Sequence, residues 1–267
     1  MVQEENEVEI RIDGPVGLPT LIYLPGLHGD WTLLPGFREQ AKSKFRLVQF
    51  TYPRTLKWTL VDYARAVDEA LNREGIRSGW VLAESYSSQV AWEWLRLGEE
   101  KATEFQFEGL ILAGGFVRYP MRFNLGVVRA FFAIAPWWLW RVLLRVYLAY
   151  SGFRHRNAGP VADCAKEFVE RRTKSDIAAM RARLGLIANA DFRAVARQAR
   201  CPIFHLAGII DPVVPPFSVA RWLKRNCPEF RETKVIRPAD HNVLGTEPQQ
   251  ALRQIEEWVS RSSACLK

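Results

Sequence analysis

The stretch Val81–Ser88 constrains the fold of this chain more than any other. It begins as an apolar run typical of a buried strand, and the residues after it repeat apolar side chains at helical spacing. Ser85 stands between two small residues, Ala83 and Ser87. A tight turn from strand to helix strains the backbone of such a serine and leaves its hydroxyl clear of the chain, and bulky flanking side chains would collide across the turn. The octet therefore predicts a nucleophile elbow; an ordinary polar turn between a strand and a helix is the alternative.

Two further polar residues follow predicted strands. The apolar run 202–210 predicts a buried strand, and Asp211 comes directly after it, before a proline-rich segment. Because proline cannot continue a strand ladder, Asp211 is expected where this strand leaves the sheet. The short strand predicted at 233–236 leads into a polar loop that holds His241. A serine nucleophile needs a base, and the base needs an orienting carboxylate, so Ser85, His241 and Asp211 are the candidate catalytic residues.

Other titratable residues near these positions are expected to be structural. Asp240 is next to His241 in sequence and is therefore poorly placed to reach the inward-pointing ring. Glu84 precedes the serine and is expected to form a hydrogen bond beneath the turn. The remaining histidines are expected in three settings: His205 in the core, His155 in a solvated turn, and His28 either packed in its loop or touching a substrate.

Strand and helix patterns alternate over most of the chain, which predicts a mostly parallel sheet with helices on both faces. Strands are predicted at 7–12, 21–24, 46–50, 80–83, 110–113, 202–210 and 233–236. Helices are predicted at 60–74, 88–97 and 247–260, the last with Ala251, Ile255 and Trp258 turned inward. Between 115 and 199 the alternation stops, and only helices are predicted, at 125–135, 136–150, 160–172, 175–187 and 191–197.

The order Ser85, Asp211, His241 along these strands resembles the α/β-hydrolase family, over about Leu18 to Ser260. Family members usually carry glycine at both positions flanking the serine, where this chain has alanine and serine. The resemblance implies an α/β-hydrolase core over 1–115 and 200–267, with an all-helical cap inserted at 116–199. It also argues against the dehalogenase and epoxide hydrolase branches, which use an aspartate at the elbow.

The resemblance further implies an oxyanion hole made of two backbone N–H groups. One belongs to the residue after the nucleophile, here Tyr86, and the other to the loop that follows the strand ending at Leu24. Leu27, which follows the first glycine of this loop, is the first candidate. The dipeptide His28–Gly29 would instead nominate Asp30, but it lies four residues beyond the strand and is ranked second.

The expected cap is rich in aromatic and basic residues. Its large apolar residues are too many for one helical face, and Arg141 and Arg145 share a face. Three interpretations remain open: a buried cap core with snorkelling arginines, an apolar acyl pocket, or a lid that contacts anionic lipid weakly. The candidate substrate-binding residues are Phe131, Trp137 and Trp138.

Composition narrows the class of protein. The net charge is +8, but the seven arginines between 115 and 160 are spread among large apolar residues, so nucleic-acid binding is not favoured. The N-terminal residues lack the apolar run of a signal peptide. The four cysteines show no metal spacing and are expected to be reduced thiols of a cytoplasmic protein: Cys164, Cys201, Cys227 and Cys265. No metal or cofactor is expected.

Together these features predict a serine hydrolase that cleaves small-molecule carboxylic esters with an apolar acyl group. Acyl transfer and hydrolysis of thioesters, lactones, lipids, peptides or carbon–carbon bonds use the same three residues and remain alternatives. A non-catalytic, membrane-associated binding protein is the rival from another class, although a binding module has no need for an ordered serine, aspartate and histidine.

Overall fold

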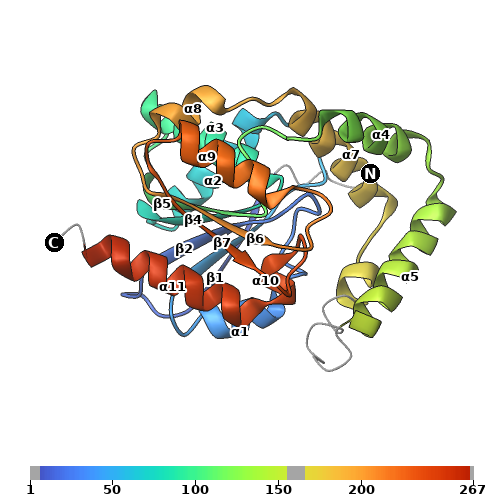
Figure 1. The fold of residues 1–267 in the computed structure, drawn as a ribbon, viewed down its shortest axis with the longest axis horizontal. Helices are drawn as coiled ribbons and strands as arrows, with labels where there is room; N and C mark the ends of the chain where they lie inside the picture. The colour runs from blue at the N-terminus through green and yellow to red at the C-terminus, as the bar shows by residue number, and fades with distance from the viewer. Residues whose placement is uncertain (1–6, 155–165, 265–267) are drawn as a thin grey trace.

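The computed structural model describes residues 7–154 and 166–264. Its centre is a seven-stranded sheet in the order β1-β3-β2-β4-β5-β6-β7 (Figure 1). Only β1 runs antiparallel to its neighbour, so the prediction of a mostly parallel sheet is confirmed. The strands are β1 Glu9–Asp13, β2 Thr20–Leu24, β3 Arg46–Thr51, β4 Ser78–Glu84, β5 Gln106–Ala113, β6 Ile203–Gly208 and β7 Phe230–Ile236.

Helices cover both faces of the sheet and form two apolar cores with it (Figure 1). One core contains side chains of α2 Leu60–Arg73, α3 Ser87–Glu99, α8 Arg193–Gln198 and α9 Pro216–Asn226. The other contains side chains of α1 Pro35–Ala41, α10 Val243–Thr246 and α11 Pro248–Ala264. The central strands are buried on both faces, which explains why they appear in the sequence as continuous apolar runs rather than alternating ones.

The long amphipathic helices form where their periodicity predicts. In α2 the side chains of Thr59 and Asp62 cap the first turn reciprocally, so that two otherwise unpaired N–H groups are satisfied. In α11 the predicted inward residues Ala251, Ile255 and Trp258 are fully buried. Both helices therefore pack against the sheet through their periodic apolar stripe.

Other elements differ from the sequence-based expectation. β6 ends at Gly208, two residues earlier than predicted, and Ile209 and Ile210 are 43% and 52% exposed. A side chain at Gly208 would lie 2.2 Å from the carbonyl oxygen of Asp240, so the loop after β7 packs directly against the end of β6. The helices α1 and α9 were not predicted; both are short and begin with a proline, which suits the first turn of a helix.

The segment between β5 and β6 contributes only helices among the described residues: α4 Arg122–Ile134, α5 Trp137–Arg154, α7 Lys174–Asn189 and α8. In Figure 1, α4, α5 and α7 lie together at one side of the sheet. In contrast, α8 packs against α3 and α9 on the sheet itself. The predicted helix 160–172 lies partly outside the described residues, of which 166–170 are helical.

The structure describes two of the four cysteines. Cys201 and Cys227 are free and buried, and burial raises the pKa of the Cys201 thiol to about 12. Cys164, Cys265 and His155 lie outside the described residues. Among the helices that the structure describes, none is both long enough and apolar enough to cross a membrane.

His205 is fully buried in β6, and we expect it to make stability depend on pH. Burial lowers its pKa to about 4, so the folded protein holds this ring neutral. The unfolded chain binds the proton near pH 6.5, and stability is therefore lost progressively as the pH falls from about 6.5 to 4, by roughly 3 kcal/mol. His205→Leu should flatten this part of the stability curve, measured by urea unfolding at several pH values. An unchanged slope would show that other groups cause it.

Candidate active site

Ser85 occupies the sharp turn between β4 and α3. Its backbone has φ +48°, a left-handed conformation that is strained for a residue with a side chain. The turn is held to the end of β5: the Ser85 N–H donates to the carbonyl of Ala113 at 2.9 Å. The hydroxyl of Ser88 donates to the carbonyl of Ser85 at 2.6 Å and accepts from the N–H of Phe116 at 3.0 Å. These bonds fix the hydroxyl of Ser85 at the carboxyl edge of the sheet.

The structure brings Ser85, His241 and Asp211 into one hydrogen-bonded chain. His241 Nε2 lies 2.8 Å from Ser85 Oγ, and His241 Nδ1 lies 2.8 Å from Asp211 Oδ2. The other carboxylate oxygen of Asp211 accepts the N–H groups of Val213 and Val214, both at 2.8 Å. An ionised carboxylate only accepts, so Nδ1 carries the proton and Nε2 is left to accept the serine proton.

The loop that carries His241 is fixed by close backbone packing. Gly114 has φ +58°, and a side chain there would come within 3.3 Å of the His241 ring. Asp240, the neighbour considered as an alternative acid, accepts the N–H of Asn242 at 3.0 Å. Among the described carboxylates it is Asp211, not Asp240, that bonds the imidazole.

Two backbone N–H groups beside Ser85 are available for a ligand. Those of Leu27 and Tyr86 donate to no acceptor among the described residues. Tyr86 is the N-cap of α3, where the helix dipole favours negative charge. The second-ranked candidate, Asp30, does not line the cavity at Ser85, and its side chain accepts the N–H of Thr32 and pairs with Arg172. The geometry thus favours Leu27 and Tyr86 as the oxyanion donors.

Two buried arginines from the insertion hold the loop after β2. Arg183 of α7 is 1% exposed and donates to the carbonyls of Leu27 and Pro53 at 3.0 and 3.1 Å. The ion pair between Arg172 and Asp30 adds a second link. Burial alone would raise the pKa of Asp30, but the charges of His28 and Arg172 outweigh it and lower the pKa. Neither arginine was predicted from the sequence to have this role. For Arg183 the available signal was its place on the buried stripe of α7, four residues after Ala179 and four before Ile187.

We expect Arg183→Met to destabilise the protein by about 2–4 kcal/mol, because it leaves buried carbonyls of the neighbouring loops without donors. The matched control is Arg181→Met on the same helix, whose side chain is exposed and which should cost about 0.5 kcal/mol or less. Chemical denaturation of both variants checks the prediction. Equal loss in the two variants would show that the contacts of Arg183 add nothing.

A cavity of about 930 Å³ opens onto Ser85. Its polar end carries Ser85, His241 and Asp211 together with Glu84, His28 and Asn242, and the rest is mainly apolar. The insertion contributes much of the apolar wall: Leu125 and Val128 of α4, Tyr147 and Tyr150 of α5, Phe168, and Met180, Leu184 and Ile187 of α7. This volume and lining suit an apolar ligand of up to drug size.

The three residues predicted from the sequence to bind substrate do not line this cavity. Phe131 packs its ring against Trp140, at 5.2 Å between centroids. Trp138 is 65% exposed, and Trp137 lines a different cavity. These residues lie at the junction of α4 and α5, whereas the later part of α5 reaches the cavity through Tyr147 and Tyr150.

Glu84 and His28 lie beside the triad. Glu84 is buried and accepts the hydroxyl of Tyr23, as expected for a bond beneath the turn. Burial and the charge of Glu84 raise the pKa of Tyr23 well above its ordinary value. His28 lines the cavity, and its ring lies edge-on to that of Phe168 at 5.8 Å. Among the described residues, no three His, Cys, Asp or Glu side chains are arranged to hold a metal ion.

Solved structures resemble this chain over nearly its whole length. A thermophilic esterase from Thermogutta terrifontis aligns with a TM-score of 0.73 and 21% identity, covering 96% of this chain and 93% of the esterase. The chain has the α/β-hydrolase fold. An enol-lactonase from Burkholderia xenovorans LB400 aligns with a TM-score of 0.73 and 14% identity over 96% of both chains. The esterase RhEst1 from Rhodococcus sp. ECU1013 aligns with a TM-score of 0.72 and 15% identity, over 95% of this chain and 94% of the esterase. No protein-family model and no curated protein sequence matches the chain.

Proposed function

We propose that the protein is a carboxylic ester hydrolase with Ser85 as its nucleophile. The observation that carries this proposal is the pair of 2.8 Å contacts that join Ser85 to His241 and His241 to Asp211. The strained turn at Ser85 and the two unpaired N–H groups beside it supply the other parts that acyl transfer requires. The esterases among the structural neighbours agree with this chemistry.

In the proposed reaction, His241 Nε2 takes the proton of Ser85 as Oγ attacks the ester carbonyl. The N–H groups of Leu27 and Tyr86 hold the oxyanion of the tetrahedral intermediate, each worth about 3 kcal/mol in the transition state. His241 then gives the proton to the leaving alcohol, and the acyl group stays on Ser85. Asp211 holds the imidazole tautomer and stabilises the imidazolium. Water, deprotonated by His241, releases the acid and restores the serine.

The substrate class follows from the cavity wall. Apart from its polar end, the cavity at Ser85 is lined by aliphatic and aromatic side chains, so the proposed substrate is a small-molecule ester with an apolar acyl group. The helices α4, α5 and α7 supply a large share of this wall and act in the proposal as a cap on the α/β core. The helix α8, which packs on α3 and α9, belongs with the core in this division.

Lactone hydrolysis is the second candidate, favoured by the likeness to the enol-lactonase. A lactone is a cyclic ester, and the same attack of Ser85 opens its ring without releasing a separate alcohol. Transfer of the acyl group to an alcohol differs only in the group that attacks the acyl-enzyme.

A fluorophosphonate probe tests the proposal directly. We expect it to label the wild type at Ser85 and to leave Ser85→Ala unlabelled. p-Nitrophenyl esters from acetate to dodecanoate then measure the acyl preference, simple lactones test ring opening, and added butanol separates transfer from hydrolysis by its ester product. A folded wild-type protein that neither reacts with the probe nor hydrolyses any ester would overturn the proposal in favour of a binding protein.

A further inference from the structure

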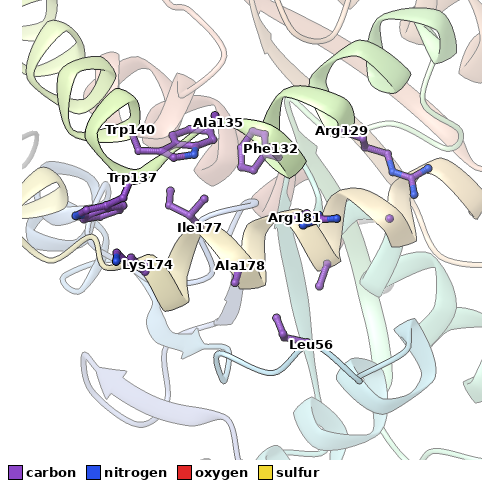
Figure 2. Close-up of a pocket in the computed structure, with 12 residues that line it drawn as sticks. Leu56, Arg129, Phe132, Ala135, Trp137, Trp140, Lys174, Ile177, Ala178 and Arg181 are labelled. Carbon is purple, nitrogen blue, oxygen red and sulfur yellow. The ribbon is translucent and has the colours of Figure 1, made fainter.

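A second cavity, of about 630 Å³, lies between α4, α5 and α7 (Figure 2). None of its lining residues also lines the cavity at Ser85. The two cavities share helices but use different faces of them. Ile177, Ala178 and Arg181 of α7 face the second cavity, whereas Met180 and Leu184 face the first. Because the two cavities share no lining residue, the second cavity is a separate site.

Three cations surround this cavity without a partner. Arg129, Lys174 and Arg181 line it, and none of them forms an ion pair or a side-chain hydrogen bond with a described residue. No acidic side chain is among its described lining residues. By contrast, Arg172 of the insertion is paired with Asp30. Uncompensated positive charge around a hollow attracts an anion.

The wall between the cations is apolar and aromatic. Figure 2 shows Phe132 and Trp140 above Ile177, with Lys174 beside Trp137 on one side and Arg129 and Arg181 on the other. The rings of Phe132 and Trp140 lie 4.4 Å apart and form a continuous surface. The indole N–H of Trp140 is buried and has no acceptor among the described residues.

We infer that this cavity binds an organic carboxylate with an apolar body. The carboxylate lies between Arg129 and Arg181, which come from two different helices, and the apolar body covers Phe132, Trp140 and Ile177. The volume suits a medium-length alkyl or aryl acid. A single soluble ligand fits better than a lipid surface, because the cations border a hollow that a flat surface does not fill. Ser85 takes no part in this binding.

Calorimetric titration of the full-length protein with decanoate tests the inference. Arg129→Gln/Arg181→Gln should weaken binding about tenfold, since it removes two charge-assisted contacts at exposed positions. Arg141→Gln/Arg145→Gln is the matched control, because it removes the same charge from exposed positions of α5 that do not line the cavity, and it should leave the affinity unchanged. Decanol should bind more weakly than decanoate, because it lacks the negative charge that Arg129 and Arg181 attract.

A variant that narrows the other cavity separates the two sites. Leu184 lines the cavity at Ser85 and not the second one, so Leu184→Phe narrows the first cavity and the affinity for decanoate should not change. Loss of binding in Leu184→Phe would place the ligand at Ser85 and overturn the inference. Equal weakening in both arginine pairs would also overturn it, because it would mean general electrostatic attraction. Binding to phosphatidylglycerol vesicles without binding of monomeric decanoate would also overturn the inference, because the three cations would then bind a lipid surface and not a single soluble ligand.

Discussion

Ser85→Ala is expected to lower kcat for ester hydrolysis by about 10⁶-fold, because no other group then forms the acyl-enzyme and the triad acts as a unit. A small residual rate above that in water should remain from binding and from the two oxyanion N–H groups. Turnover of a p-nitrophenyl ester that fits the cavity, measured against free hydrolysis, checks the value.

The control for this variant is Ser218→Ala, an exposed serine at the start of α9 whose hydroxyl donates only to the local carbonyl of Pro215. It should leave kcat unchanged. Circular dichroism and thermal unfolding should show that Ser85→Ala is folded, since the change removes a single oxygen at a strained turn. A folded Ser85→Ala protein with more than a few per cent of the wild-type kcat would mean that the reaction uses another nucleophile.

Asp211→Asn is expected to lower kcat by about 10⁴-fold. The asparagine amide presents its NH₂ to His241 Nδ1 and so favours the tautomer that carries the proton on Nε2. That nitrogen lies 2.8 Å from Ser85 Oγ and then donates to the serine instead of accepting its proton. Steady-state kinetics on the same ester measure the loss, and KM should change little because Asp211 does not bind the acyl group.

Asp240→Asn is the matched control, because it makes the same chemical change one residue before His241. Asp240 Oδ1 accepts a backbone N–H within its own loop, so this variant should lose less than about tenfold in kcat. If Asp240→Asn lost more activity than Asp211→Asn, Asp240 would be the carboxylate that orients the imidazole, and the assignment made here would be wrong.

The positions of the site residues followed from local sequence because each one lies shortly after the end of a strand. Ser85 follows β4, Asp211 comes soon after β6, and His241 comes soon after β7. The carboxyl ends of parallel strands meet at one edge of the sheet, so residues 156 positions apart, such as Ser85 and His241, lie within 2.8 Å of each other. Strand ends were predicted less well, as at β6, where the loop that packs against Gly208 comes from a later part of the chain.

In the insertion, by contrast, the contacts that the helices make could not be predicted from the sequence. Its helices were predicted from their periodicity, but periodicity identifies the apolar face of a helix and not what lies against it. The aromatic residues at the start of α5 therefore became substrate-binding candidates, although it is Tyr147 and Tyr150 from its later turns that line the cavity at Ser85. Arg183 likewise appears in the sequence as one more basic residue, and only its contacts reveal that it holds Leu27.

The sequence by itself thus determined the class of fold, the mostly parallel sheet and the three residues proposed as catalytic, because strand patterns and turn chemistry are local. Only the tertiary structure decided which helix faces line the cavity at Ser85, which arginines hold the loop after β2, and that α4, α5 and α7 enclose a second cavity lined by cations. These features depend on how separate helices pack against one another, and side chains from distant parts of the chain form each of them.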